Sequence, residues 1–229
     1  MKPLVIIPAR AGSKGVLGKN IKLLNGKPLI QYTLDAAKEV FHDDEICVST
    51  DSLEIKIIVE KNGLVVPFIR PSELATDTAS TYDVLLHALD YYERKNYFPD
   101  LVVLLQVTSP FRTGKQIKEA MSLYKDQYDM LVSVKETKSN PYYVLFEENE
   151  KGFLRKSKKS DFTRRQDCPK VWEYNGAIYL INPESLKKSN LNSFKKIVKY
   201  EMNEFSSHDI DTEFDWKIAE YMMALKDKD

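Results

Sequence analysis

The sequence is poor in the residues that build disulfide frameworks and metal clusters. Its 229 residues include only two cysteines and three histidines. Cys47 and Cys168 are too few and too far apart for a disulfide framework or a cysteine-based zinc site. Net charge is absent as well, because 34 lysines and arginines balance 34 aspartates and glutamates. This balance excludes a protein that coats nucleic acid through a global positive field, so we expect no nucleic-acid partner, although it allows a local basic patch.

Long hydrophobic runs are missing too. The first apolar run, Leu4–Ile7, is followed at once by Pro8 and Arg10, so it is too short for a signal-peptide core or a membrane span. We therefore expect a cytoplasmic protein with no membrane partner. A chain of this length buries about 70% of the surface that its unfolded form exposes, so one domain with a single core needs no disulfide or structural metal.

Short apolar runs alternate with longer segments of helical period. Apolar residues that recur every three or four positions, such as Ile30, Leu34 and Ala37, predict helices between the runs. The runs are rich in leucine and β-branched residues and predict buried strands at Leu4–Ile7, Ile46–Val48, Val65–Phe68, Leu101–Leu105 and Leu131–Val134. This alternation predicts an α/β fold with a mostly parallel central sheet, right-handed crossovers and helices on both faces.

The alternation stops between residues 135 and 171. A basic stretch at residues 151–170 holds eight lysines and arginines against two aspartates. We interpret residues 135–171 as an irregular arm or hairpin rather than a second domain. Three interpretations remain open for it: a solvated loop, a basic segment over an anionic ligand, or an arm exchanged between subunits.

Regular structure is predicted to return after the arm. Strands are expected at Ala177–Ile181 and Ile197–Tyr200. A last helix then follows, with Thr212 as its N-cap and Asp215 three residues further on.

A glycine-rich basic loop leaves the carboxyl end of the first predicted strand. It reads Pro-Ala-Arg-Ala-Gly-Ser-Lys-Gly over residues 8–15 and continues to Gly18-Lys19-Asn20. Ligands of open α/β sheets bind at this edge, and glycines let backbone N–H groups approach a phosphate. Arg10, Lys14 and Lys19 can neutralise a triphosphate and the charge on its leaving group. The spacing excludes both the P-loop and the dinucleotide-binding fingerprint; an ordinary turn with surface lysines is the alternative.

Two further polar segments end predicted strands. Ser49-Thr50-Asp51 can cap the next helix or face a ligand. Gln106 can offer a donor and an acceptor to a base edge. Thr108 and Ser109 behind it can equally cap a helix.

Two carboxylates, Asp209 and Asp211, lie two residues apart near the end of the sequence. In an extended segment such side chains point the same way. Mg²⁺ prefers one or two carboxylates plus substrate phosphate oxygens, and a cation would relieve repulsion between these acids and a triphosphate. The alternative is charge that complements the dipole of the following helix. We expect His208 to serve as a capping or supporting residue rather than a metal ligand.

Together these segments resemble the acylneuraminate cytidylyltransferases, which load nine-carbon keto-sugar acids onto CMP. The resemblance spans the chain from Ile6 to the final helix, and the order and spacing of its motifs are specific. A departure is Val107, where many relatives carry proline. The motifs are Ile7-Pro8-Ala9-Arg10, Gly12-Ser13-Lys14-Gly15, Lys19-Asn20, Ser49-Thr50-Asp51, Arg70-Pro71-x-Glu73-Leu74-Ala75, Asp77-Thr78-Ala79-Ser80, Gln106-x-Thr108-Ser109-Pro110-x-Arg112, Asn175-Gly176-Ala177-Ile178-Tyr179 and Asp209-Ile210-Asp211-Thr212.

The resemblance implies a Rossmann-like nucleotidyltransferase of one domain, residues 1–229, that forms a homodimer through the arm. It implies catalytic roles for Arg10, Lys14, Lys19 and Asp211, and a Mg²⁺ cofactor held by Asp209 and Asp211. Arg164 or Arg165 would match a basic residue near the acid sugar. The nucleotide and sugar pocket would include Arg10, Gly12, Ser13, Lys19, Asn20, Arg70, Ser80, Gln106, Asn175 and Gly176.

The implied substrates are CTP and a 2-keto-3-deoxy sugar acid of the N-acylneuraminate type. The anomeric hydroxyl attacks the α-phosphorus and pyrophosphate leaves, a reaction that depends on positioning and charge neutralisation. Legionaminic, pseudaminic and deaminated neuraminic acids are alternative substrates; the octulosonate version fits less well because its loop usually lacks the Lys19-Asn20 pair. Two other classes remain: a glycosyltransferase, since residues 209–211 form a D-x-D motif, and a non-catalytic nucleotide-binding module.

Overall fold

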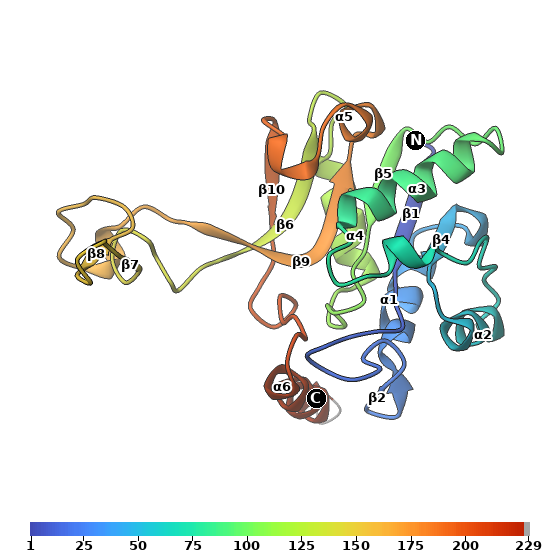
Figure 1. The fold of residues 1–229 in the computed structure, drawn as a ribbon, viewed down its shortest axis with the longest axis horizontal. Helices are drawn as coiled ribbons and strands as arrows, with labels where there is room; N and C mark the ends of the chain where they lie inside the picture. The colour runs from blue at the N-terminus through green and yellow to red at the C-terminus, as the bar shows by residue number, and fades with distance from the viewer. Residues whose placement is uncertain (227–229) are drawn as a thin grey trace.

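A six-stranded sheet forms the centre of the molecule in the computed structural model, which describes residues 1–226 (Figure 1). The sheet order is β10-β6-β9-β5-β1-β4. The pairs β1–β4, β1–β5 and β6–β10 are parallel, whereas β9 runs antiparallel to both neighbours. The strands of this sheet are β1 (Pro3–Pro8), β4 (Ile46–Ser49), β5 (Leu101–Leu104), β6 (Met130–Glu136), β9 (Trp172–Ile181) and β10 (Ile197–Glu201).

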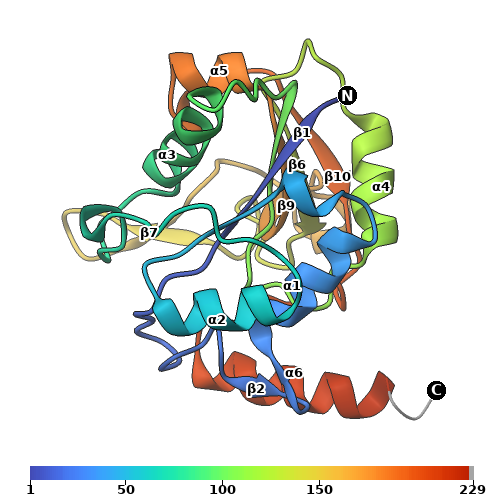
Figure 2. The ribbon, with the colours of Figure 1, turned by 90° about the vertical axis from the view of Figure 1, so that its right-hand side faces the viewer.

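Helices cover both faces of the sheet, as the sequence predicts. Figure 2 shows α3 and α5 on one side and α4 on the other. The α-helices are α1 (Leu29–Lys38), α2 (Leu53–Lys61), α3 (Thr81–Glu93), α4 (Gly114–Leu123), α5 (Pro183–Lys188) and α6 (Glu213–Lys226). Four single-turn 3₁₀ segments are η1 (Asp43–Glu45), η2 (Ser72–Leu74), η3 (Arg165–Asp167) and η4 (Leu191–Ser193). None of the helices within residues 1–226 is both long and apolar enough to cross a membrane.

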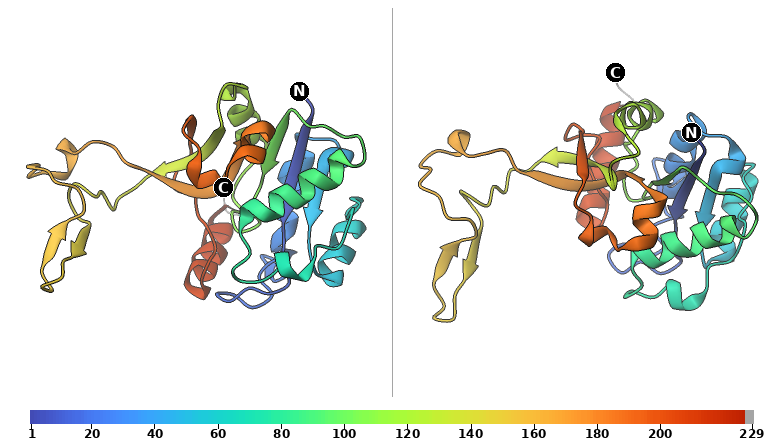
Figure 3. Two further views of the ribbon diagram at one scale, coloured as in Figure 1. Left: turned by 45° about the horizontal axis from the view of Figure 1, so that its top comes forward. Right: turned by 90° about the horizontal axis from the view of Figure 1, so that it is seen from above.

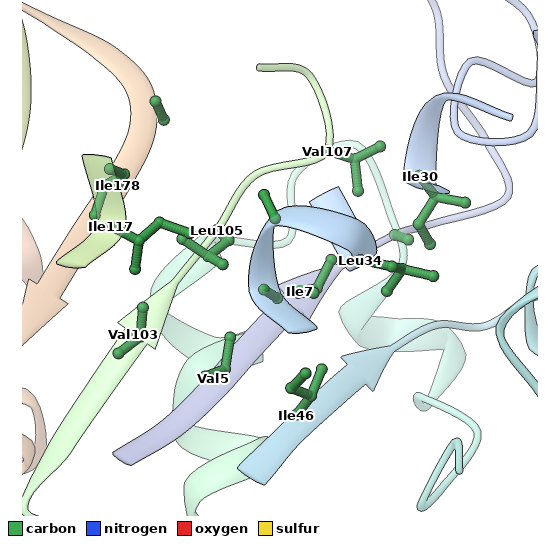
Figure 4. Packing of buried hydrophobic residues seen from close by; sticks show 14 of the residues in the cluster. Val5, Ile7, Ile30, Leu34, Ile46, Val103, Leu105, Val107, Ile117 and Ile178 are labelled. Carbon is green, nitrogen blue, oxygen red and sulfur yellow. The ribbon is translucent and has the colours of Figure 1, made fainter. Parts of the chain in front are cut away.

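Strand alternation divides the core into two clusters. In β1, Val5 and Ile7 belong to the cluster that includes residues of α1, α2, α4 and α6, and Figure 4 shows them with Ile30 and Leu34 of α1 and Ile117 of α4; Leu4 and Ile6 belong to the cluster on the side of α3 and α5. All four side chains are fully buried, so β1 has hydrophobic contacts on both faces, as parallel strands do. The largest fully buried side chain is Trp216 of α6, and it secures the last helix against the rest of the core.

The prediction of a strand at Val65–Phe68 is wrong. The segment is irregular, and a single bridge joins Thr50 to Ile69 beside it. Pro67 lacks the N–H that a ladder requires, and Val65 is exposed rather than buried. The segment therefore passes along the edge of the sheet without extending it.

The arm leaves the sheet between β6 and β9 and projects away from it (Figures 1 and 3). It contains a small hairpin of β7 (Phe146–Glu148) and β8 (Leu154–Lys156), in agreement with the arm or hairpin expected from the sequence. At its base β9 begins at Trp172, earlier than predicted, and pairs there with Glu136 of β6. A second short hairpin, β2 (Leu23–Leu24) with β3 (Lys27–Pro28), precedes α1.

Candidate active site

A cavity of about 400 Å³ lies at the carboxyl ends of β1 and β5. This is the edge at which open α/β sheets bind ligands. Its wall brings together segments from four parts of the chain, and includes nine residues that the sequence assigns to a site: Arg10, Gly12, Ser13, Lys14, Lys19, Asn20, Arg70, Gln106 and Asp211. The remaining lining residues are Pro8, Gly15, Leu74, Thr76, Asp77, Ala79, Thr81, Val84, Val107 and Thr108.

The glycine-rich loop is held against the segment that carries Asp211. The side-chain amide of Asn20 donates to the carbonyl of Arg10 at 2.8 Å and so joins the two ends of the loop. A Cβ on Gly15 would lie 1.8 Å from the carbonyl oxygen of Asp211. Only glycine permits this approach, because any side chain here would push the loop off the Asp211 segment.

Asp77 bridges two of the loop cations. Its carboxylate lies 2.9 Å from Arg10 and 2.7 Å from Lys14. The hydrogen bond from Lys14, followed by the charges of Lys14 and Arg10, lowers the pKa of Asp77. Arg10 also donates to the carbonyl of Thr76 at 2.8 Å. Arg10 and Lys14 therefore lie together at one wall of the cavity, where the carboxylate of Asp77 neutralises part of their charge.

Lys19 is buried beside residues 209–211, which we call the acidic segment. Its Nζ donates to the carbonyl of Ile210 at 2.5 Å and to Oδ1 of Asp211 at 3.2 Å. The Lys19 side chain is only 10% exposed, whereas that of Asp211 is 73% exposed. The lysine thus fixes the backbone of the acidic segment and leaves the Asp211 carboxylate open to the cavity.

Arg70 also lines the cavity. It is 4% exposed, and its Nη2 lies 3.8 Å from Oδ1 of Asp51. Burial is the main cause that lowers its pKa. Asp51 itself accepts a hydrogen bond from the N–H of Ala11 at 2.9 Å, so it joins the end of β4 to the glycine-rich loop, although it is not among the residues that line the cavity. The cap of α2 is Ser52, which accepts from the N–H of Ile55, so residues 49–51 do not cap this helix; a ligand contact by them stays a prediction.

Residues after β5 also contribute to the wall. Thr113, not Thr108 or Ser109, caps α4. Gln106 and Thr108 line the cavity, and the carbonyl of Thr108 accepts from the N–H of Ile210 at 2.9 Å. This bond connects the end of β5 to the acidic segment.

Asp209 lies deeper than Asp211, outside the lining residues of the cavity. Its Oδ1 is buried and has no hydrogen-bond partner among residues 1–226. Burial is the main cause that raises the pKa of Asp209. A buried carboxylate oxygen without a partner is costly, and a bound cation would remove that cost. The two carboxylates therefore fit the Mg²⁺ site that the sequence suggests.

The carboxylate pair would need ligands from elsewhere to complete a metal shell. Within residues 1–226, no three or more His, Cys, Asp or Glu side chains gather where they could hold a metal ion. Mg²⁺ commonly takes its remaining ligands from water and substrate phosphates. His208 is engaged instead with the carbonyl of Asp215 at 2.9 Å, in keeping with a supporting role.

Five other predicted site residues lie outside the cavity wall. Ser80 is the N-cap of α3, where it accepts from the N–H of Asp83 at 3.1 Å. Asn175 is buried within a hydrogen-bond network, and the backbone of the adjacent Gly176 has φ +74°. Arg164 and Arg165 belong to the projecting arm, where Arg164 forms a two-point ion pair with Asp167 at 2.8 and 2.9 Å.

Two residues of the site had no assigned role in the sequence-based prediction. Asp77 belongs to the quoted motif, but its pairing with the loop cations becomes visible only in three dimensions. Arg112 is 3% exposed, and its Nη1 donates to the carbonyls of Gln106 at 3.1 Å and Ala177 at 2.8 Å. Burial lowers its pKa to about 9. It bridges β5 and β9 where the two strands separate beneath the cavity.

Known proteins share both the sequence pattern and the fold. Residues 4–225 match the family model described as "Cytidylyltransferase". The chain is 34% identical over 226 residues to the CMP-N,N'-diacetyllegionaminic acid synthase of Legionella pneumophila, covering 98% of this chain and 97% of that protein. It is 40% identical over 222 residues to the N-acylneuraminate cytidylyltransferase of Streptococcus agalactiae serotype III, covering 94% of this chain and 52% of that protein. The chain thus spans about half the length of this streptococcal relative.

A solved structure, of CMP:2-keto-3-deoxy-manno-octonic acid synthetase complexed with CTP, superimposes with a TM-score of 0.72. It is 18% identical and covers 99% of this chain and all of that one, so it supports the fold. The family model and the two relatives confirm the resemblance drawn from the motifs. On this evidence the chain belongs to the cytidylyltransferase family, a family of nucleotidyltransferases.

Proposed function

We propose that this protein joins CTP to a nine-carbon 2-keto-3-deoxy sugar acid, releasing pyrophosphate and a CMP-linked sugar acid. The observation that carries the proposal is the cluster of Arg10, Lys14, Lys19 and Arg70 around one cavity at the carboxyl edge of the sheet. Four cations in one cavity suit a triphosphate, whose recognition depends on charge-assisted hydrogen bonds. The names of the two relatives supply the nine-carbon acids as the second substrate.

The reaction would replace one phosphoanhydride bond with a phosphodiester bond. The anomeric hydroxyl oxygen of the sugar acid attacks the α-phosphorus, the bond to the β-phosphate oxygen breaks, and the hydroxyl proton passes to solvent or to a base that the site residues do not identify. Negative charge accumulates on the departing pyrophosphate. Arg10, Lys14 and Lys19 would bind these oxygens, and removing one such donor typically lowers kcat by about 10²–10³.

Mg²⁺ is part of the proposal. Asp209, with its unpartnered buried Oδ1, and Asp211, whose carboxylate faces the cavity, would hold the ion. Mg²⁺ bound there would neutralise triphosphate charge and help to orient the phosphates. Asp211→Ala should then abolish metal-dependent pyrophosphate release and leave the fold intact. Retained activity in this variant would refute the metal assignment.

A homodimer in the cytoplasm, where CTP is made, completes the proposal. The arm carries large apolar side chains that are more than 40% exposed in the isolated chain: Val144, Leu145, Phe146, Phe153 and Leu154. A monomer seldom leaves such a projecting apolar element uncovered. The arm would bring Arg164 and Arg165 to the acid sugar in the site of the partner subunit, because in the structure they lie apart from the cavity of their own chain.

The test is a substrate panel. Purified protein with Mg²⁺ and CTP is incubated separately with N-acetylneuraminic, legionaminic, pseudaminic, deaminated neuraminic and octulosonic acids, and pyrophosphate is measured. The proposal expects release only when a nine-carbon acid is present. Release with the octulosonic acid alone, or with no acid at all, would contradict it.

A further inference from the structure

Strand β9 contains a large bulge beside the site. Its register with β6 pairs Val132 with Tyr179 and then Val134 with Tyr174. Four residues of β9, 175–178, therefore lie opposite the single residue Ser133. A bulge of this size needs side-chain partners for the backbone groups that leave the ladder.

The Ser133 hydroxyl closes the bulge. It accepts from the N–H of Ile178 at 2.8 Å and donates to the Oδ1 of Asn175 at 2.6 Å. The same oxygen of Asn175 accepts from the N–H of Ala177 at 3.2 Å. Ser133 and Asn175 are 0% and 3% exposed, so these bonds are shielded from water and costly to break.

The other end of the Asn175 amide reaches the acidic segment. Its Nδ2 donates to the hydroxyl of Ser207 at 2.8 Å, and Ser207 is 1% exposed. Both polar atoms of the Asn175 side chain are therefore engaged within the protein. Ser207 lies two residues before Asp209, so a continuous chain of side-chain bonds joins β6, β9 and the segment with both carboxylates.

The bulge also faces Asp209 directly. Gly176 is at its tip, and a Cβ there would lie 3.7 Å from Oδ1 of Asp209 and 3.5 Å from Oε1 of Gln106. Beyond Asp209 the segment is fixed by the bond from the Ile210 N–H to the Thr108 carbonyl. Asp209 is thus held between two anchors, with Ser207 on one side and Ile210 on the other.

We propose that Ser133, Asn175 and Ser207 are positioning residues that set the place of Asp209 for cation binding, and that Asn175 acts through Ser207 rather than by touching substrate. This inference rests on the proposed function, because it assigns the cation to Asp209. It differs from the role implied by resemblance, in which Asn175 contacts the substrates. Partners that orient a metal ligand typically contribute about 10–100-fold to metal affinity.

The experiment measures Mn²⁺ binding by electron paramagnetic resonance in the presence of CTP alone, with steady-state kinetics alongside. Ser207→Ala is expected to weaken Mn²⁺ binding about tenfold and to lower kcat, with the KM for the sugar acid within about twofold of wild type. Ser207→Thr keeps the hydroxyl and should restore both values. Ser206→Ala, at the adjacent buried serine, is the control and should match wild type.

A double-mutant cycle separates positioning from substrate contact. If Asn175 acts through Ser207, Asn175→Ala weakens Mn²⁺ binding, and adding Ser207→Ala produces little further loss, because the two effects are not additive. An Asn175→Ala variant that raises the KM for the sugar acid, with Mn²⁺ affinity unchanged, overturns the proposal. Unchanged Mn²⁺ affinity in Ser207→Ala also overturns it, and leaves the proposed function standing if the wild type still releases pyrophosphate. Wild-type protein that neither binds Mn²⁺ nor turns over would refute the proposed function, and this inference with it.

Discussion

The cations of the cavity already have anionic neighbours before a nucleotide arrives. Asp77 lies between Arg10 and Lys14, and Asp211 contacts Lys19. A triphosphate must therefore replace or share these carboxylate contacts. Each new phosphate contact then contributes to the binding free energy only the difference between the new ion pair and the one it replaces. This arrangement keeps the loop in place without substrate, at the expense of some affinity for the nucleotide.

Asp77→Asn should strengthen CTP binding. The amide cannot neutralise Arg10 and Lys14, so both cations become free for phosphate oxygens, and we expect the Kd for CTP to fall several-fold and to depend more steeply on salt. Isothermal titration with CTP alone measures this. Because Lys14 lowers the pKa of Asp77, this carboxylate stays charged at neutral pH. The difference in Kd for CTP between Asp77→Asn and wild type should therefore persist across neutral pH. Asp90→Asn, which removes an exposed pair with Arg94 on α3, is the control; weaker binding by Asp77→Asn would show instead that Asp77 is needed to orient Arg10.

At the scale of elements, the contact between the glycine-rich loop and the Asp211 segment determines whether the cavity forms. Gly15→Ala places a Cβ 1.8 Å from a backbone carbonyl, so loop and segment must separate. Gly12→Ala meets no atom within 4 Å and lies in the same loop. We expect Gly15→Ala to lose at least tenfold in kcat/KM for CTP, about 1.4 kcal/mol. Gly12→Ala should lose less than Gly15→Ala. Equal losses would mean that the contact is not what shapes the site.

Asp129 connects three elements through one carboxylate. It accepts from the N–H groups of Lys195 and Lys196 at 3.0 and 2.8 Å and from the Ser185 hydroxyl at 2.7 Å. The bond from the Lys196 N–H is the first cause of the lowered pKa of Asp129. A pKa below the unfolded value of about 3.9 means that the carboxylate stabilises the fold above that pH and loses its effect as pH falls through the lower folded value.

Asp129→Asn should accordingly reduce the free energy of unfolding at pH 7, with a difference from wild type that shrinks below about pH 4. Urea denaturation at a series of pH values measures this. Asp126→Asn, an exposed carboxylate three residues earlier, should show no comparable difference. A gap between Asp129→Asn and wild type that widens in acid would contradict the assignment.

Elements with strong hydrophobic patterns were predictable from the sequence, and elements defined by pairing were not. The continuous apolar run Leu4–Ile7 identified β1, and the alternation of such runs with helical segments identified the sheet with helices on both faces. The Thr212–Asp215 spacing identified the capped start of α6, where Asp215 accepts from the N–H of Thr212 at 2.7 Å. Val65–Phe68 carries the same apolar signal but has no partner strand. Antiparallel insertion of β9 between β5 and β6 also leaves no local mark on the sequence.

The part of the site that one continuous segment supplies was predictable from the sequence. The part that several distant segments supply was less predictable. The glycine-rich loop is continuous, so Arg10, Lys14 and Lys19 could be grouped from their spacing alone. The role of Asn175 depends on Ser133 and Ser207, which lie 42 and 32 residues away. The hydrogen bonds of the Asn175 side chain form only because β9 bulges there, and no local sequence pattern reveals that bulge.

At the scale of the whole molecule, the neutral composition conceals a separation of charge. Cations gather in the glycine-rich loop and in the arm, and carboxylates gather in residues 209–211. The structure brings the glycine-rich loop and Asp211 to one cavity and leaves the arm projecting (Figure 3). In the proposed homodimer, the projecting arm would reach the site of the partner subunit.

Mixing two inactive variants tests this arrangement. Lys19→Ala disables the cavity, and the double variant Arg164→Ala, Arg165→Ala disables the arm. If the arm acts in the partner's site, mixed dimers contain one intact site, and about a quarter of the wild-type rate should return after subunit exchange. Sedimentation should show a species of twice the chain mass that dissociates in a Phe153→Ser, Leu154→Ser variant. No recovery on mixing, with dimers demonstrably exchanged, would place the arm outside the site.

The central claim is that the cavity transfers CMP from CTP to a nine-carbon sugar acid, and ³¹P NMR of one reaction tests it most directly. Purified protein, CTP, Mg²⁺ and the sugar acid that releases most pyrophosphate are followed over time. The account predicts a phosphodiester signal and a pyrophosphate signal that grow in equal amounts as CTP disappears, in wild type and not in Lys19→Ala. Formation of CDP with inorganic phosphate, or unchanged CTP with every nine-carbon acid, would contradict it.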